Sequence, residues 1–228
     1  MSALNERVIL VSGAGGSLGA ATAKALAAAG ATVVLLGKTI SRLEQVYDDI
    51  EAAGHPKPAI YPLDLRGATE QDYAQLAENL KEELGGLHGL VHTAAEMRHL
   101  EPLDQITLAH WESSLRVNLT APFLMTRALL PMLIQSRATV VFTTDSAART
   151  GLAYWGAYGI SKTALERLAG LLSHEQAGKI NVHVFEPGAM DSTLRRRAFP
   201  GEAVPLLPTP ATAAARIAAL FDIPITPF

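Results

Sequence analysis

Val8-Ile9-Leu10-Val11-Ser12-Gly13-Ala14-Gly15-Gly16-Ser17-Leu18-Gly19 joins a short apolar run to a cluster of glycines, and an alanine-rich helical pattern follows as far as Ala29. A continuous apolar run of this length is typical of a buried strand, and the glycines mark a tight turn. Gly30 stands where a helix usually ends, and residues 32–36 form a second buried apolar run. The stretch therefore predicts a strand, a glycine turn, a helix and a second strand parallel to the first.

Strand and helix patterns alternate along the rest of the chain. Further strands are expected at about 59–63, 87–92, 139–143 and 181–185. Helices are expected at about 41–53, 70–84, 155–172 and 211–221, with two consecutive helices within about 108–134. Pro122 and Pro131 are the expected turn or kink points of that region. Such alternation predicts an α/β protein with a parallel sheet, in a single domain over residues 1–228.

Composition and charge exclude several classes of protein. The chain has 228 residues, 49% of them hydrophobic, which suits one larger α/β domain with a substantial core. The formal charge of -3 and the pI near 6.2 leave no basic surface for nucleic acid, and no apolar run reaches the length of a membrane helix. Cysteine is absent and the N-terminus lacks the layout of a signal peptide, so a cytoplasmic protein is expected. The histidines show no spacing typical of metal ligands, and no metal is expected.

The glycine turn is the first chemical signal. Glycines let the backbone approach a pyrophosphate, which is then held by amides and by the positive end of the following helix. A tight turn without a ligand is the alternative, but the flanking strand and helix favour a dinucleotide. The strict G-x-G-x-x-G spacing is absent because Leu18 stands in its last place, and three glycines form G-x-x-G-x-x-G instead. The cofactor-binding residues predicted in this turn are Ser12, Gly13, Gly16, Ser17, Leu18 and Gly19.

The end of the second strand indicates which cofactor is bound. An acid about twenty residues past the glycine turn would hold the ribose hydroxyls of NAD, whereas this chain has Gly37-Lys38 there. A glycine followed by a lysine leaves room for a 2′-phosphate and attracts it, so NADP(H) is preferred and NAD(H) is the second choice. An ordinary solvated lysine is the alternative for Lys38.

A phenol and an amine four residues apart, Tyr158 and Lys162, follow the fifth strand. Apolar residues recur around them at helical spacing, so both groups are expected on one face of a helix. A phenol ordinarily has a pKa of about 10, and a nearby ammonium lowers this pKa by favouring the phenolate. The pair is therefore a candidate proton donor and acceptor near neutral pH.

The glycine turn, Asp64, Asn118, the Tyr158/Lys162 pair and Pro187-Gly188 lie in the order and approximate spacing of the short-chain dehydrogenase/reductase family, which the chain resembles as far as about Ser192. The segments 155–158 and 197–200 look most like the YciK-type oxidoreductase branch of that family. The resemblance implies a Rossmann-type doubly wound parallel sheet in strand order 3-2-1-4-5-6, with the site at the carboxyl ends of the strands. It also implies hydride transfer between a nicotinamide cofactor and a carbonyl or secondary alcohol. Because the chain stops soon after its last helix, the family's seventh strand is expected to be missing or very short.

The resemblance also assigns roles to particular residues. Tyr158 would protonate the carbonyl oxygen, or take the alcohol proton in reverse, and Lys162 would lower the pKa of Tyr158 and hydrogen-bond the nicotinamide ribose. Asn118 would help to hold a water that links Lys162 to solvent, whereas a helix cap or kink is the alternative for this residue. Further cofactor contacts are implied at Asp64, Leu65, Thr93, Ala94, Pro187, Gly188 and Ser192, besides Lys38, Tyr158 and Lys162.

One departure from the family concerns catalysis. A serine usually stands thirteen residues before the tyrosine, and here that position is Asp145. An ionised carboxylate would raise the pKa of Tyr158, against the effect of Lys162, whereas in a dry site a protonated Asp145 would donate a hydrogen bond as the serine does. Ser146 or Thr144 would replace the serine after a small loop shift. The sequence leaves these alternatives open.

Two further departures concern the cofactor site. The family's Asn-Asn-Ala-Gly after the fourth strand is His92-Thr93-Ala94-Ala95 here, and the family's middle glycine falls at Ser17. Gly16 produces a spacing similar to that of extended and atypical members, some of which bind NADP(H) as sensors without turnover. A sensor or regulatory protein with weak or no turnover is therefore the alternative to an enzyme.

The segment 189–208 is rich in proline, glycine and arginine, and we expect a mobile loop that folds over the nicotinamide and shapes the substrate pocket. Within it, Arg195-Arg196-Arg197 is either a clamp for an acidic substrate or the cofactor phosphate, or a solvated face. The apolar helices at about 119–134 and 155–172 resemble the surfaces through which family members pair. A homodimer or homotetramer acting on a small molecule, without nucleic acid or membrane, is therefore expected.

Overall fold

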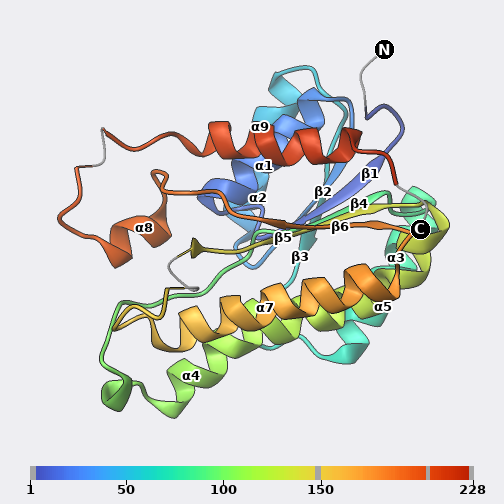
Figure 1. The fold of residues 1–228 in the computed structure, drawn as a ribbon. Helices are drawn as coiled ribbons and strands as arrows, with labels where there is room; N and C mark the ends of the chain where they lie inside the picture. Colours follow the sequence, from blue (N-terminus) through green and yellow to red (C-terminus); the bar gives the residue numbers. More distant parts are fainter. Residues whose placement is uncertain (1–3, 147–149, 204–205, 226–228) are drawn as a thin grey trace.

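A six-stranded parallel sheet forms the centre of the computed structural model, which describes residues 4–146, 150–203 and 206–225 (Figure 1). Its strand order, β3-β2-β1-β4-β5-β6, is the predicted one. The strands are β1 (Val8–Ser12), β2 (Thr32–Gly37), β3 (Ala59–Pro62), β4 (Gly89–His92), β5 (Thr139–Thr143) and β6 (Asn181–Phe185). In the central part of the sheet, the last residue of β1, Ser12, pairs with Leu36 and His92. The carboxyl ends of these strands therefore meet at one edge.

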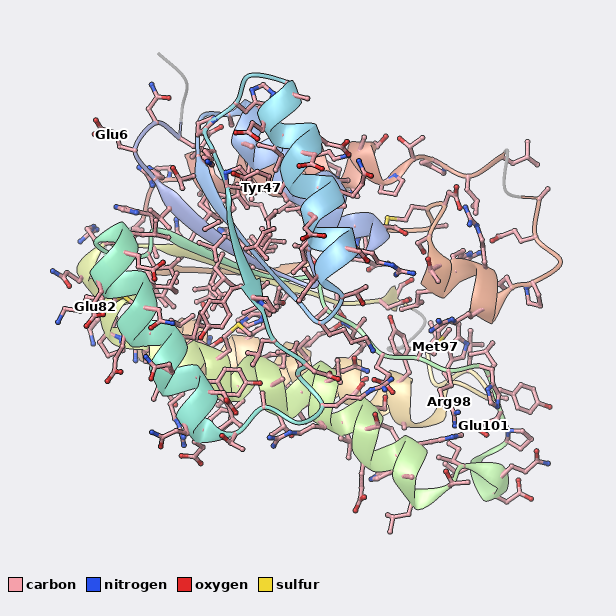
Figure 2. All side chains as sticks on the ribbon, turned by 180° about the vertical axis from the view of Figure 1, so that it is seen from behind. Glu6, Tyr47, Glu82, Met97, Arg98 and Glu101 are labelled. Atoms are coloured by element: carbon pink, nitrogen blue, oxygen red, sulfur yellow. The ribbon has the colours of Figure 1, made fainter. Side chains whose placement is uncertain are left out.

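Helices cover both faces of the sheet (Figure 1). They are α1 (Ser17–Ala28), α2 (Ile40–Ala52), α3 (Glu70–Leu84), α4 (Leu108–Leu115), α5 (Ala121–Gln135), α7 (Gly156–Glu175), α8 (Thr193–Ala198) and α9 (Pro210–Ala219). On one face, α1, α2 and α9 pack on Ile9 and its neighbours, and on the other, α3, α5 and α7 pack on Leu10 and its neighbours. Successive residues of β1 thus point into opposite cores, as the pleat of a strand requires. Figure 2 shows that charged side chains such as Glu82 of α3 point away from the sheet.

The two helices predicted within 108–134 are α4 and α5, but neither proline separates them. A π-helical turn at Arg116–Thr120 joins them into one helical stretch. Pro122 lies in the first turn of α5, where its missing amide is tolerated, and Pro131 is accommodated inside α5. The irregular turn instead contains Asn118, which is fully buried.

The stretch Leu108–Gln135 is long and apolar enough, by length and composition, to cross a membrane. The expectation that no segment reaches this length is therefore wrong. Half of its most apolar window is buried inside the molecule, where Leu124, Leu129 and Leu133 belong to the core. A core helix passes the same test of length and composition, and packing against the sheet accounts for these apolar residues.

The segment 189–208 contains a short helix, α8, where a loop was expected. Ser192 begins this helix as its N-cap, and the Ser192 hydroxyl accepts a hydrogen bond from the Arg195 amide at 3.1 Å. The chain then returns to the sheet at α9, which is followed by a 3₁₀ turn at Leu220–Asp222. Within the described residues the sheet has no strand after β6.

Candidate active site

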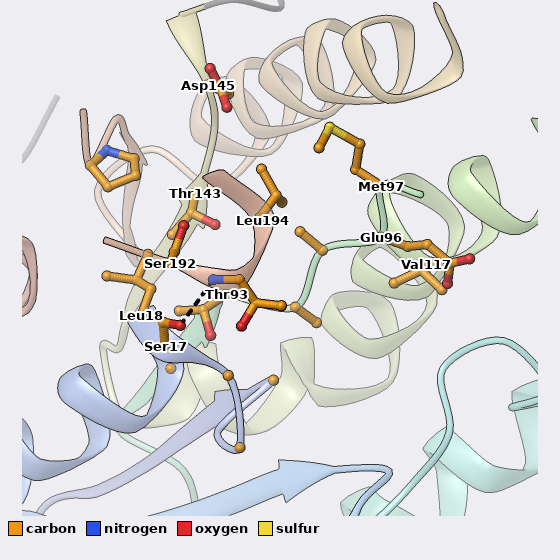
Figure 3. A pocket seen from close by; sticks show the side chains of 18 of the residues that line it. Ser17, Leu18, Thr93, Glu96, Met97, Val117, Thr143, Asp145, Ser192 and Leu194 are labelled. Carbon is orange, nitrogen blue, oxygen red and sulfur yellow. Dashed lines mark hydrogen bonds between the residues drawn. The ribbon is translucent and has the colours of Figure 1, made fainter. Parts of the chain in front are cut away.

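A cavity of about 490 Å³ opens at the carboxyl ends of the strands. Its walls come from the glycine turn after β1, the ends of β2 and β3, the loops after β4, β5 and β6, and the helices α7 and α8 (Figure 3). Among the described residues, every predicted cofactor residue except Ser12 lines this cavity. Of the predicted catalytic residues, Tyr158, Lys162, Asp145 and Ser146 line it and Asn118 does not.

The glycine turn needs its glycines for steric reasons. Gly13 has a φ of +72°, and a Cβ added there would lie 2.7 Å from the backbone of Ala94. A Cβ on Gly19 would lie 2.2 Å from the Gly13 carbonyl oxygen. Real Cβ atoms do not approach other heavy atoms so closely, so the turn and the loop after β4 fit together only without these side chains.

The turn also fits an anion. Within the described structure, helix α1 has no side-chain cap at Gly16 and no acidic residue in its first turn. The first residues of α1, Ser17 and Leu18, line the cavity, and no acidic side chain of the first turn is available to pair with their amides. Amides at a helix N-terminus bind phosphate, so the residues present suit the pyrophosphate of a dinucleotide.

Basic side chains gather where β2 and β3 end. Lys38 lines the cavity together with Arg42 and Arg66. The sequence reasoning missed both arginines, although Arg42 lies four residues after Lys38 near the start of α2 and a Cβ on Gly15 would meet the Arg42 Cβ at 2.9 Å. Arg66 forms a 2.6 Å ion pair with Glu96, a residue that was also missed. Burial opposes ionisation of Glu96, but hydrogen bonds from Arg66 and Ser113 outweigh it and hold the pKa of Glu96 below its ordinary value.

Tyr158 and Lys162 lie on the buried face of α7, as their spacing predicts, and both are nearly inaccessible to solvent. The Tyr158 hydroxyl donates to Asp145 Oδ2 at 3.1 Å. The Lys162 ammonium donates to the Thr143 carbonyl oxygen at 2.9 Å, and it lies 5.9 Å from the centre of the Tyr158 ring. Phenol, ammonium and carboxylate thus share the base of the cavity.

The expected lowering of the Tyr158 pKa by Lys162 is not found. Burial raises the pKa of Tyr158 well above its ordinary value, and the Asp145 carboxylate raises it further by charge repulsion and by accepting the phenol's hydrogen bond. Burial also lowers the pKa of Lys162 to about 8, although Asp145 opposes this effect. The prediction considered only the charge of the nearby ammonium, whereas desolvation is the largest effect on the pKa of both groups.

Three residues were considered as replacements for the serine. Of these, Thr144 uses its hydroxyl to donate a hydrogen bond to the Glu166 carboxylate. Ser146 is exposed at the rim of the cavity, and the next described residue is Thr150. Asp145 is the one of these three that contacts the Tyr158 hydroxyl.

Asn118 holds the loop after β4. Its Oδ1 accepts from the Glu96 amide at 2.7 Å, and its Nδ2 donates to the Glu96 carbonyl oxygen and to the hydroxyls of Ser114 and Ser161. The three bonds that Nδ2 donates are 2.9 to 3.1 Å long. The side chain of Asn118 therefore fixes the cavity wall, and its role towards Lys162 and a water stays a prediction.

Ser12 and His92 are buried behind the cofactor turn. The Ser12 hydroxyl has no hydrogen-bond partner among the described residues, and the side chain is 1% exposed. Thr93 donates to the Ser12 carbonyl oxygen at 2.6 Å and thereby ties the loop after β4 to β1. His92 bonds to the Thr126 hydroxyl at 2.9 Å and stacks on Phe142, and burial lowers its pKa to about 3. It packs in the core behind the cavity.

Helix α8 closes one side of the cavity. The Thr193 amide donates to the Ser17 hydroxyl at 3.4 Å, the dashed contact of Figure 3, so α8 reaches the glycine turn. Pro187, Gly188 and Ser192 line the same side, as predicted. Across the described part of the chain, no group of three or more His, Asp or Glu side chains suits a metal ion.

The site combines a glycine turn that fits a pyrophosphate, basic side chains at the ends of β2 and β3, and a buried Tyr158/Lys162 pair on one Rossmann-type sheet. These features are those of a nicotinamide-dependent oxidoreductase. The family model for short chain dehydrogenases matches residues 7–203, and the chain belongs to this family, whose members act on CH–OH and C=O groups.

Individual relatives agree with this assignment. The chain is 37% identical over 209 residues to the uncharacterized oxidoreductase YciK of Escherichia coli strain K12, over 91% of this chain and 83% of YciK. A solved structure described as a short chain dehydrogenase from Pseudomonas syringae matches with a TM-score of 0.93 at 41% identity, over 96% of this chain and 90% of that one. Another so described, from Escherichia coli CFT073 and complexed with NADPH, matches with a TM-score of 0.93 at 35% identity, over 96% and 92% of the two chains.

Proposed function

We propose that this protein is an NADP(H)-preferring oxidoreductase that transfers hydride between the nicotinamide and a carbonyl or secondary alcohol of a small molecule. The observation that carries the proposal is one continuous cavity with Lys38 and the glycine turn at one end and Tyr158 at the other. The relative complexed with NADPH supports the choice of cofactor.

The chain's own residues suit each part of the cofactor. The amides of Ser17 and Leu18 would hold the pyrophosphate, and Lys38 with Arg42 would pair with a 2′-phosphate. Asp64, Leu65, Thr93 and Ala94 would border the adenosine half. Pro187, Gly188, Ser192 and Lys162 would border the nicotinamide half.

Lys162, Pro187, Gly188 and Ser192 would hold the reduced nicotinamide, which would supply a hydride to the carbonyl carbon. Tyr158 gives its phenolic proton to the carbonyl oxygen, so that C=O becomes CH–OH, and the phenolate is reprotonated from solvent. In the oxidative direction Tyr158 accepts the alcohol proton instead. The Thr143 carbonyl holds the Lys162 ammonium beside the phenol, 5.9 Å from the centre of the Tyr158 ring.

The contact of Asp145 with Tyr158 supports a second candidate function. The Tyr158 hydroxyl donates to Asp145 where a substrate oxygen would have to accept that proton, and the phenol's pKa is raised. An NADP(H)-binding sensor with weak or no turnover is therefore the alternative. A protonated Asp145 would instead donate a hydrogen bond to the substrate oxygen and would permit turnover.

Titration of the purified protein with NADPH and NADH, followed by fluorescence, tests the cofactor, and a screen of aldehydes, ketones and quinones tests turnover. We expect tighter binding of NADPH, and we expect Lys38→Ala and Arg42→Ala to remove most of that preference, because each deletes a cation from the 2′-phosphate site. An unchanged preference in both variants would refute the cofactor assignment. NADPH binding without oxidation, in wild type and in Asp145→Ser, would favour the sensor.

Three further proposals concern the oligomeric state of the protein, a lid over its site and its location in the cell. We propose that the single domain pairs into a homodimer or homotetramer through α5 and α7, where Phe123, Ile160 and Leu171 are exposed. We further propose that 189–208 acts as a lid over the nicotinamide, and that the protein is cytoplasmic, in keeping with its lack of cysteine.

A further inference from the structure

Helix α8 and its flanks place three consecutive arginines beside the cavity, and two of them are neutralised by carboxylates. Arg195 forms two 2.6 Å hydrogen bonds with Glu202, and its guanidinium stacks 3.9 Å from the centre of the Phe199 ring. Arg196 points to the outside and forms a 2.6 Å ion pair with Asp191. Neither pair leaves an unbalanced charge for a ligand.

Arg197 differs from its neighbours. It lines the cavity, and its Nη1 donates to the carbonyl oxygen of Met97 at 3.2 Å. Among the described residues, no carboxylate is its ion-pair partner. A guanidinium has five N–H donors in a planar fork, so Arg197 retains donors and a full charge at the rim.

The cavity lined by Arg197 and by the Tyr158 phenol also has an apolar wall. Met97 and Leu194 form this wall, and behind it they pack in one cluster with Trp155 and Ala198. Figure 3 shows Met97 and Leu194 pointing into the space next to Asp145, and Figure 2 places Met97 on the extended segment that continues to Glu101. A substrate that spans this wall would need an apolar carbon skeleton.

Charges at the two ends of this wall set the orientation of a bound molecule. At one end the Asp145 carboxylate contacts the Tyr158 hydroxyl and interacts with the Lys162 ammonium, so the two charges at this end offset each other. At the other end the charge of Arg197 is not offset and attracts an anion. An anionic group would therefore point to Arg197 and leave the reacting carbonyl at Tyr158.

From this placement we propose that the substrate is a carbonyl compound, or the corresponding alcohol, with an apolar skeleton and a carboxylate that binds Arg197. The proposal rests on the proposed oxidoreductase function and names its substrate class. A carboxylate fits because its two oxygens match the guanidinium fork.

The test compares matched pairs of probes, namely ω-oxo carboxylates of four to eight carbons and their methyl esters. With NADPH, wild type should show kcat/KM about 10-fold or more higher for the acids, mostly through KM, as expected for a charged hydrogen-bonded pair. Arg197→Gln should abolish this preference and leave the esters nearly unchanged. Arg196→Gln is the matched control, since Arg196 does not line the cavity, and should retain the preference.

Equal rates for acids and esters in wild type, or an equal loss for both in Arg197→Gln, would overturn the proposal. The second outcome would mean that Arg197 merely fastens the lid to Met97.

A binding measurement separates this proposal from the proposed function. Trp155 packs in one cluster with Met97 and Leu194 of the apolar wall, so its fluorescence in a Trp111→Phe variant loaded with NADP⁺ can report a titration with octanoate and with methyl octanoate. Tighter binding of octanoate that disappears in Arg197→Gln supports the carboxylate site even where no probe is reduced, a case that refutes the oxidoreductase alone. No preference for octanoate refutes the carboxylate site.

Discussion

Three ionisable side chains share the base of the cavity, and their burial decides their chemistry. Lys162 is 2% exposed and Tyr158 is 6% exposed. Desolvation disfavours the charged form of each, which raises the pKa of the phenol and lowers the pKa of the amine. The phenol therefore keeps its proton in this state, which suits a donor to a carbonyl oxygen better than an acceptor from an alcohol.

Burial of the Lys162 ammonium should make stability depend on pH. Its pKa falls from 10.5 to about 8 on folding, so between these values the unfolded chain binds more protons. The contribution to stability is present above the unfolded pKa and is lost as the pH falls through about 8. Relative to Lys162→Met, which lacks this proton, wild type should gain roughly 2 kcal/mol between pH 7 and pH 9.5. Urea unfolding of both proteins measures this, and a constant difference would contradict it.

His92 should make the protein sensitive to acid. Its pKa falls from 6.5 to about 3 on folding, so its stabilising contribution is complete above pH 6.5 and is lost as the pH falls through about 3. Between pH 7 and pH 4, wild type should lose roughly 3 kcal/mol more than His92→Gln, a variant that can still bond to the Thr126 hydroxyl. Parallel acid unfolding curves for the two proteins would refute this account.

For single residues, the sequence predicts the placement of those whose position depends only on their neighbours in the chain. The spacing of Tyr158 and Lys162 places them on one helix face, and the structure agrees. The sequence could not show that Lys162 bonds to the Thr143 carbonyl or that Arg42 and Glu96 face the cavity, because these contacts join segments far apart in the chain. It also could not decide the sign of the Tyr158 pKa shift, which depends on burial.

Among the elements, the glycine turn carries the tightest steric requirement. A Cβ on Gly19 would meet the Gly13 carbonyl oxygen at 2.2 Å, whereas a Cβ on Gly170, on the exposed side of α7, would meet nothing within 4 Å. Gly19→Ala should therefore destabilise the fold by about 3 kcal/mol or more. Gly170→Ala should stabilise it by about 0.5–1 kcal/mol, because alanine suits a helix interior better. Denaturant unfolding of both variants checks this, and a neutral Gly19→Ala would show that the turn tolerates a side chain.

Elements with a clear periodicity were predictable, and those set by tertiary contacts were not. The predicted bounds of 70–84 match α3, which ends at Gly85 in the left-handed conformation. The π-helical turn contains Asn118, whose bonds to Glu96 and Ser161 join segments far apart in the chain, and such contacts leave no periodicity in the sequence. Helix α8 was missed because a helix of six residues has too few turns to show periodicity.

For the whole molecule, the exposed apolar side chains on α5 and α7 predict self-association. Phe123 is 41% exposed and Leu171 is 63% exposed. Analytical ultracentrifugation at micromolar concentration should show a dimer or tetramer, which Phe123→Glu with Leu171→Glu should dissociate by burying like charges in the interface. Leu206→Glu is the control, because Leu206 is 85% exposed and lies on the lid side. A monomeric wild type would contradict the proposed interface.

The alternation of strands and helices predicted a parallel α/β sheet, because a right-handed crossover leaves few topologies for such a pattern, and the family resemblance supplied the strand order. The order β3-β2-β1-β4-β5-β6 brings the glycine turn, the loop after β4 and the end of β5 to one edge of the sheet. The Tyr158 and Lys38 ends of one cavity are thereby joined, although 120 residues separate them in the chain. This arrangement is why the site could be predicted in outline.

The most direct test of the central claim compares wild type with Tyr158→Phe by two readings on the same samples, the Kd for NADPH and the rate of NADPH oxidation with the best carbonyl probe. Loss of one hydroxyl should leave the Kd within about 2-fold and lower the rate about 100-fold or more, since proton transfer by a positioned group contributes about that much. NADPH oxidation by Tyr158→Phe at the wild-type rate would show that Tyr158 is not the proton donor and would contradict the account.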